Sequence, residues 1–206
     1  MRRDARRLLP AVAAAMLATA GRADDPSALE ELASLLEAQV GVGRAAIESG
    51  LDGLQPALAG AAAPAVAALI AASRDAAIAS GVEPIPESIR REIADYVPAD
   101  VLDAVRWCVR CGGELSLQRS TFLLGIAPAI TLDHVIVFAK LDDALNDPAL
   151  WMHELKHVMQ FREWGLDEFA RRYLEDYAAV EREAWDFRWA WVKSTGWLER
   201  RKLARR

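Results

Sequence analysis

Residues 151–160 of the chain read WMHELKHVMQ, and this stretch contains the pattern H-E-x-x-H. Four residues of an α-helix advance by about 400°, so His153 and His157 would lie one turn apart on nearly the same face. Two imidazoles placed in this way can reach a single metal ion. Glu154 would lie beside them, where its carboxylate can take a proton from a water molecule at that ion. The pattern is the two-histidine signature of zinc hydrolases, so we expect Zn²⁺ as cofactor, His153 and His157 as metal ligands and Glu154 as catalytic base.

The residues around the motif favour the helix that this geometry requires. Asp147 is a good N-cap, and Pro148 suits the first helical position, where a backbone N–H has no intrahelical partner anyway. Gly165 follows as a C-cap. The alternative interpretation is a solvated helix that carries two surface histidines.

The first 23 residues have the composition of a secretion signal. Arginines at the start precede an apolar, alanine-rich run of about 13 residues, which is short for a membrane span, and small residues follow it. We therefore expect residues 1–23 to be a signal peptide and the mature protein to be periplasmic or secreted. An uncleaved N-terminal anchor is the alternative.

The charge of the mature chain argues against nucleic-acid binding. Without residues 1–23 the chain keeps 20 basic and 29 acidic residues, because that segment holds five arginines and one aspartate. A net charge near −9 is unfavourable for a polyanionic partner. The basic tail, which we place at 197–206, could still contact an anionic membrane surface.

Residues 24–82 form an alanine-rich segment for which we expect helices and a packing role. A helical candidate covers 58–73, although Pro56, Gly60 and Pro64 interrupt its pattern. Its apolar run contains a proline and is mostly alanine, so we do not expect it to cross a membrane. The stretch 28–80 contains no His, Cys, Tyr or Trp, so we expect no chemistry from it.

The middle of the chain predicts short helices over 87–96 and 98–109 and candidate strands over 114–118 and 121–126. The best strand is 131–138, which is rich in β-branched and aromatic residues. Near the metal it is either an edge strand that holds an extended substrate or an ordinary core strand. Cys108 and Cys111 form one C-x-x-C pair, which is either a local disulfide or two free thiols.

A catalytic zinc ion usually has three protein ligands, and no histidine follows His157. We therefore expect a carboxylate after the turn at Gly165. The candidates are Glu175, Asp176, Glu181 and Glu183.

Two arguments from the residues favour different carboxylates. On a helix over 178–193, Glu181 falls within a tryptophan-rich face, where an unpaired carboxylate would be costly. A straight antiparallel hairpin would instead bring Glu175 level with His157. Glu181 could reach the site only if the chain bends or breaks within about 173–178.

From Pro84 onward the chain resembles a family of bacterial zincin-like domains, the core domain associated with extracellular contractile injection systems. Its members carry H-E-L-x-H-V-x-Q after a strand of T-L-x-x-x-I-V-F type, as this chain does at 153–160 and 131–138. In related gluzincins, E-x-x-A carries the third metal ligand on its glutamate, so the resemblance implies Glu181. An aspartate often follows that alanine, whereas here Trp185 does, which removes a carboxylate from beside the ligands.

The expected fold class is α+β and mostly helical, with a zincin-like domain over 83–196 that holds a small sheet and the H-E-x-x-H helix. We expect a zinc-dependent, peptidase-like hydrolase with a peptide or protein substrate. The alternative is a catalytically silent zincin-like module for binding or assembly in the cell envelope. Candidates for stabilising an oxyanion are Tyr173, Tyr177 and His134. An exposed patch among the tryptophans of the last helix would point to a partner.

Overall fold

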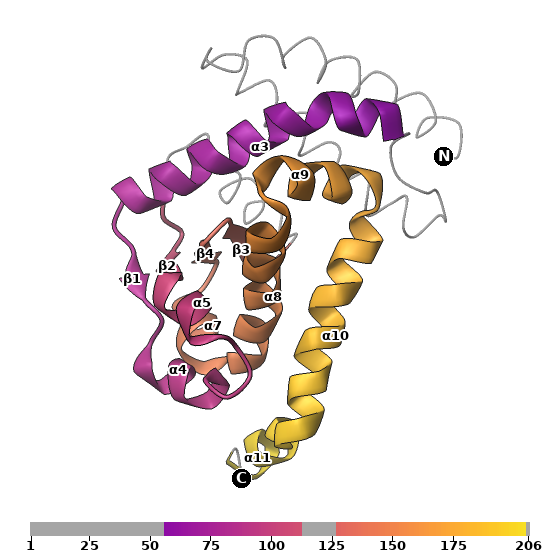
Figure 1. Ribbon diagram of the computed structural model, residues 1–206. Coiled ribbons are helices and arrows are strands. Elements are labelled where there is room, and N and C mark those ends of the chain that lie inside the picture. Colours follow the sequence, from indigo (N-terminus) through magenta and orange to yellow (C-terminus); the bar gives the residue numbers. More distant parts are fainter. Residues whose placement is uncertain (1–55, 113–126, 205–206) are drawn as a thin grey trace, which may run out of the picture.

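The computed structural model describes residues 56–112 and 127–204, and these form a mostly helical fold with a small sheet (Figure 1). The expected α+β class is confirmed. The predicted signal peptide, residues 24–55 and the candidate strands 114–118 and 121–126 lie outside the described residues. The helices are α3 (Pro56–Ala79), α4 (Glu87–Ile93), α5 (Ala99–Ala104), α7 (Leu141–Asn146), α8 (Pro148–Trp164), α9 (Leu166–Glu175), α10 (Tyr177–Thr195) and α11 (Trp197–Ala204). The strands are β1 (Glu83–Pro84), β2 (Arg106–Val109), β3 (Ala129–Leu132) and β4 (Val135–Phe138).

The sheet has the order β1-β2-β4-β3, in which β2 and β4 run parallel and the outer pairs run antiparallel. All four residues of β4 are buried, as expected for a central strand. The prediction of one strand over 131–138 is wrong, because the chain reverses between β3 and β4. Asp133 takes a φ of 60° at the reversal, a left-handed conformation that aspartate tolerates better than most residues.

The prediction of a helix over 98–109 is also wrong in its second half. The helix α5 ends at Ala104, and Arg106–Val109 pairs with β4 as β2, which suits its β-branched and aromatic residues. Cys108 is buried on β2 and forms a disulfide with Cys111. The open question about these two cysteines is therefore answered in favour of the local disulfide.

The helix α8 begins and ends as predicted. The side chain of Asp147 accepts a hydrogen bond from Leu150 N at 3.0 Å, and Pro148 occupies the first turn. At the other end, Gly165 has a φ of 79°, a conformation that glycine adopts without strain. Because α8 packs against β3, α10, α4 and α7, most of its residues are buried, including both motif histidines.

The helical structure is interrupted between α9 and α10, within the range of about 173–178 where a bend or break was required for Glu181 to reach the site. The helix α9 ends at Glu175, and the side chain of Asp176 then caps α10 by accepting a hydrogen bond from Ala179 N at 2.9 Å. The helix α10 returns along α8, as Figure 1 shows. The α9 segment thus offsets α10 relative to α8 and brings Glu181 level with the motif.

The helix α3 is continuous from Pro56 to Ala79, so the expected interruption at Gly60 and Pro64 is wrong. It packs on α9 and contacts β3 and β4, and this burial compensates for the hydrogen bond lost at Pro64. Its segment Ala59–Ala79 is long and apolar enough to cross a membrane, but half of the apolar window is buried inside the protein.

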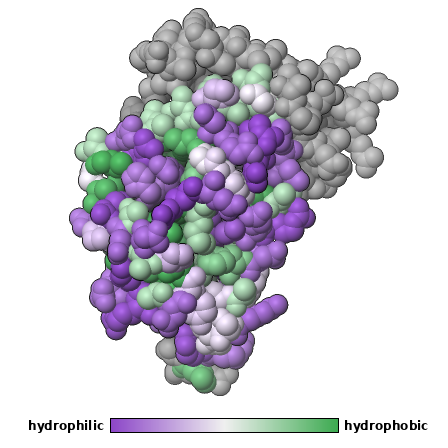
Figure 2. All heavy atoms as spheres, viewed as in Figure 1, coloured by the Kyte–Doolittle hydropathy of each residue, from purple (hydrophilic) through white to green (hydrophobic). Residues whose placement is uncertain are grey.

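The described part of the predicted basic tail is a helix attached to the domain. Trp197 of α11 is buried beside Trp191, with ring centroids 5.9 Å apart. Arg200 pairs with Glu92 at 3.2 Å, and Arg201 pairs with Asp147 at 3.5 Å. Elsewhere, hydrophilic residues cover most of the face in Figure 2, with apolar patches between them.

Candidate metal centre

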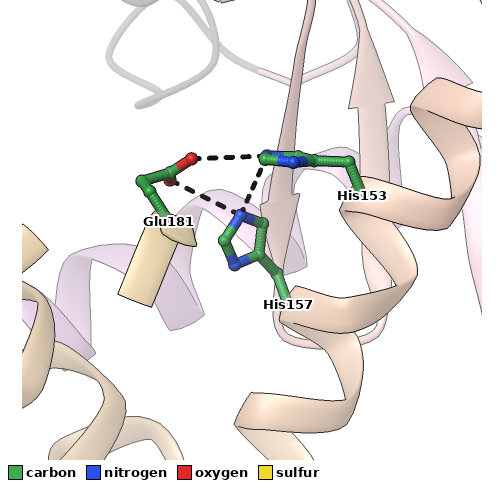
Figure 3. A group of neighbouring side chains, drawn as sticks. All are labelled: His153, His157 and Glu181. Carbon is green, nitrogen blue, oxygen red and sulfur yellow. Dashed lines mark hydrogen bonds and ion pairs between the residues drawn. The ribbon is translucent and has the colours of Figure 1, made fainter. Parts of the chain in front are cut away.

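Three of the predicted site residues converge at one point between α8 and α10. His153 and His157 project from α8, and Glu181 projects toward them from α10 (Figure 3). The Nε2 atom of His153 lies 3.3 Å from Glu181 Oε2, and His157 Nε2 lies 3.5 Å from Glu181 Oε1. The two Nε2 atoms are 3.3 Å apart. With one atom taken from each side chain, the three ligands lie within 4.8 Å of one another.

These separations fit a single metal ion. Ligand bonds of about 2.0–2.1 Å at tetrahedral angles place donor atoms about 3.3 Å apart. The two Nε2 atoms have this separation, and each lies at a similar distance from one of the two oxygens of Glu181. Two imidazole nitrogens and one carboxylate are also the donor set of several catalytic zinc sites. All three side chains are largely shielded from solvent, with Glu181 the most exposed at 18%. The cluster can therefore hold a metal ion.

Gln160 orients His157 for such a bond. Its amide nitrogen donates to Val180 O at 3.2 Å and to Glu183 Oε2 at 3.1 Å, so its oxygen is the acceptor that faces His157 Nδ1 at 2.8 Å. His157 therefore carries its proton on Nδ1, which leaves the lone pair of Nε2 free for a metal ion. Because Gln160 is fully buried between α8 and α10, it also joins the two helices.

The close contacts within the cluster shift the pKa values of Glu181 and His157. Burial acts to raise the pKa of Glu181, but the contacts with His153 and His157 outweigh it and lower that pKa to about 2. Burial acts to lower the pKa of His157, yet the carboxylate of Glu181 holds it above its usual value. Without a metal ion the cluster thus favours an imidazolium–carboxylate pair, and a binding metal ion displaces a proton.

Glu154 is held in place by the neighbouring strand. The hydroxyl of Thr131 on β3 donates to Glu154 Oε2 at 2.7 Å, and both residues are buried. This contact fixes one oxygen of the carboxylate and leaves the other without a hydrogen-bond partner among the described residues. Glu154 also lines the same cavity as the three ligands.

The cavity beside the ligands has a volume of about 310 Å³ and is mainly apolar. Tyr173 and Tyr177 line it, whereas His134 does not and instead contacts Asp133. Burial and the charge of Glu181 raise the pKa of Tyr177 to about 12. Its hydroxyl therefore stays protonated at neutral pH and can donate a hydrogen bond into the cavity.

The structure places the competing carboxylates away from the cluster. Glu175 at the end of α9 pairs with Arg171. Glu183 contacts Lys156 at 3.2 Å and Gln160, and it is half exposed. Glu181 alone among the four candidates belongs to the group of ligands found in the described residues.

Trp185, which replaces the aspartate often found at this position in gluzincins, contacts one of the candidate ligands. Its ring lies against that of His153, with centroids 4.8 Å apart. The Nδ1 atom of His153 is buried and has no hydrogen-bond partner among the described residues. His153 therefore lacks the kind of outer partner that Gln160 provides for His157.

Sequence reasoning missed three residues of this site. Thr131 and Gln160 are both part of the family motifs, which was the available signal for them. Arg188 of α10 also lines the cavity, and neither a motif nor a spacing singled it out.

Comparison with known families supports one part of the resemblance. Residues 84–165 match the model of a family described as the eCIS core domain. The match includes β3, β4 and all of α8, and hence His153, Glu154 and His157, but it ends before Glu181. Searches of curated proteins and of solved structures found no significant match. Over these residues the chain is thus similar to the eCIS core domain family.

Proposed function

We propose that the protein is a zinc-dependent hydrolase of peptide bonds, with His153, His157 and Glu181 as metal ligands and Glu154 as the general base. The observation that carries this proposal is the cavity of about 310 Å³ on whose wall all four side chains lie. A structural zinc site is closed by protein ligands, whereas a catalytic one keeps a position for water or substrate. Three ligands beside a cavity favour the catalytic arrangement.

A zinc ion held there would lower the pKa of its water to about 7 and polarise the carbonyl of the scissile bond. The carboxylate of Glu154, held through Oε2 by Thr131, takes the proton of the attacking water. It then delivers that proton to the leaving amine. Tyr177 lies one helical turn before Glu181, and its protonated hydroxyl can donate to the oxygen that gains charge.

The edge of the sheet offers a place for an extended peptide. Among the described residues, β3 pairs only with β4, and all four of its residues line the cavity. A strand with one free edge can add a peptide through main-chain hydrogen bonds, which bind without regard to side-chain identity. This arrangement supports the edge-strand interpretation of β3 and a peptide as the substrate class.

The test is a comparison of wild-type protein with Glu154→Gln, both loaded with zinc, on a mixture of peptides followed by mass spectrometry. We expect the variant to keep one zinc ion per chain and to lose at least about 10²-fold in cleavage rate. Glu163→Gln, which changes an exposed carboxylate on the same helix, is the matched control and should cleave normally. Undiminished cleavage by Glu154→Gln would exclude the proposed mechanism.

One observation favours a second function, a zincin-like module that binds without cleaving. His153 Nδ1 has no hydrogen-bond partner within the described part of the chain, and the neighbouring Trp185 stands where related gluzincins often carry a carboxylate. Outer partners of metal ligands contribute about 10–100-fold to metal affinity or activity. If wild-type protein binds zinc but cleaves no peptide in the mixture, this second function is the better description.

A further inference from the structure

The cavity beside the metal ligands contains one arginine, Arg188, and no other Lys or Arg among its lining residues. Arg188 lies seven positions after Glu181 on α10, which corresponds to about 700° of rotation and about 10 Å along the axis. The two side chains therefore leave the helix on nearly the same face. Trp185 lies between them on that face and also lines the cavity.

Arg188 forms no direct ion pair or hydrogen bond with a carboxylate among the described residues, unlike several other arginines of the fold. Arg74, Arg162 and Arg171 each form a hydrogen-bonded ion pair with a carboxylate. By contrast, the Nε atom of Arg188 is buried and has no hydrogen-bond acceptor in residues 56–112 and 127–204. A buried donor without an acceptor is unfavourable, so this group is suited to an acceptor that arrives with a ligand.

Two tryptophans position the guanidinium of Arg188. Its central carbon lies 5.0 Å from the ring centroid of Trp185 and 5.8 Å from that of Trp189. Aromatic faces stabilise a cation but provide no hydrogen-bond acceptor in the plane of the guanidinium, so its donors stay available. Burial has the largest influence on the pKa of Arg188 and lowers it, although the negative charges of Asp147 and Glu154 act to raise it.

We propose that Arg188 binds a carboxylate of the substrate, so that the site selects acidic peptides. This inference rests on the proposed function, since it names the substrate class of the same cavity. Side chains on a helix lean toward its N-terminus, so Arg188 leans toward Glu181 and the metal centre. At about 3.3 Å per extended residue, the carboxylate lies within about three residues of the scissile bond. It belongs either to an Asp or Glu side chain or to the C-terminus of the peptide.

The first experiment measures binding without turnover. Zinc-loaded Glu154→Gln protein is titrated with acetyl-Ala-Ala-Ala-Glu-amide, with its Gln counterpart, and with acetyl-Ala-Ala-Ala-Ala that ends in a free carboxylate. We expect at least tenfold tighter binding of a carboxylate peptide than of the Gln peptide, together with a shift of the Arg188 Nε–H signal in nuclear magnetic resonance spectra. Whichever carboxylate peptide binds more tightly identifies the source of the recognised group. Equal binding of all three peptides would overturn the inference.

Variants of Arg188 then assign the preference to this residue. In the Glu154→Gln background, Arg188→Gln should bind the Glu and Gln peptides equally, and Arg188→Lys should regain only part of the preference, because lysine lacks the planar fork. Arg182→Gln is the matched control, since it removes an exposed arginine from another face of the same helix and should keep the full preference. Zinc content and thermal unfolding verify that each variant folds. A preference that survives in Arg188→Gln would overturn the assignment.

Cleavage of a peptide mixture by the zinc-loaded wild type separates this inference from the proposed function. Cleavage sites enriched in Asp, Glu or a free C-terminus within three residues support both. Zinc-dependent cleavage without that enrichment overturns the inference and leaves the hydrolase intact. Carboxylate-selective binding without any cleavage would support the role of Arg188 and would contradict the proposed hydrolase activity.

Discussion

His153, His157 and Glu181 are separate in the sequence but lie together in space, and each offers a donor atom to one candidate metal site. Removing any of them would leave two candidate ligands, fewer than the three protein ligands that a catalytic zinc ion usually has. Glu175 provides a natural comparison, because it was the competing candidate and instead pairs with Arg171. The contribution of each side chain can therefore be measured separately.

We predict that wild-type protein binds one zinc ion per chain and that His153→Ala and Glu181→Gln lose it. Glu175→Gln should keep full zinc content, since its carboxylate lies outside the cluster. Elemental analysis after gel filtration measures the ratio. Zinc lost from Glu175→Gln, or retained by Glu181→Gln, would show that the third ligand is not Glu181.

We predict that Trp185→Asp strengthens zinc binding. The new carboxylate would lie close to the unpartnered His153 Nδ1 and could accept its proton, which increases the basicity of the ring. The expected gain in affinity is about tenfold, measured by competition with a fluorescent chelator. Trp189→Asp adds the same charge at an exposed position outside the cavity lining and should leave affinity unchanged. Equal gains in both variants would point to a general charge effect.

At the scale of elements, α9 sets the spacing between the two halves of the candidate metal centre. It is bounded by Gly165 with a φ of 79° and by the cap residue Asp176. The histidines stand on the helix before it, and Glu181 stands on the helix after it. If the cluster binds a metal ion, the position of the start of α10 should therefore affect its affinity.

We predict that Asp176→Ala destabilises the protein by about 1 kcal/mol, because the first turn of α10 loses its side-chain cap. Zinc affinity should fall as well, since Glu181 lies in the second turn. Urea denaturation measures the first effect, and chelator competition measures the second. Asp186→Ala changes an exposed aspartate inside the same helix and should show neither effect.

Elements with local signals were predictable from the sequence. Asp147, Pro148 and Gly165 mark the ends of α8 through cap chemistry, and the helical phase of Glu181 required the break that the structure has at Asp176. The hairpin between β3 and β4 was not predictable, because one left-handed aspartate divides a continuous β-branched run. The helix α3 crosses Pro64 because of its packing on α9, a tertiary effect that propensity does not include.

Side-chain contacts between different helices and strands could not be predicted from the sequence either. Thr131 contacts Glu154 only because β3 packs beside α8, and Gln160 reaches Val180 only because α10 returns along α8. The spacing of His153 and His157, which lie one turn apart, could be predicted from the sequence because both residues belong to one helix. Contacts between α8 and α10 depend on the offset that α9 creates between them, and no single residue or motif predicts that offset.

At the scale of the whole molecule, a metal ion would tie α8 to α10 and add its binding free energy to the stability of the fold. At a free zinc concentration 100 times the dissociation constant, that contribution is about 2.7 kcal/mol. The metal-free protein keeps the imidazolium–carboxylate pair in its place. Its stability should therefore depend on pH.

We predict that metal-free protein is most stable between about pH 4.5 and pH 6.5 as far as this cluster is concerned. The pKa of Glu181 falls from 4.5 to about 2 on folding, so its contribution is present above pH 4.5 and is lost as the pH falls toward 2. The pKa of His157 rises above 6.5, so its contribution is complete below 6.5 and is lost as the pH rises through the folded value.

Thermal unfolding with EDTA and with zinc, measured from pH 4 to pH 9, tests this dependence. The stabilisation by zinc should be larger at pH 8 than at pH 5.5, because a smaller fraction of His157 is protonated at pH 8 and fewer protons have to be displaced when zinc binds. His157→Gln protein should show no zinc-dependent difference at either pH. An increment of the same size at both pH values in wild type would contradict the prediction.

The order of the ligands along the chain has a consequence for the timing of activity in a growing polypeptide. The ribosome makes His153, Glu154 and His157 before Glu181, and Glu181 reaches them only after α10 has folded back along α8. Until then the nascent chain offers two ligands and no finished centre. If the protein cuts peptides, this delay keeps it harmless to its surroundings while it is being synthesised.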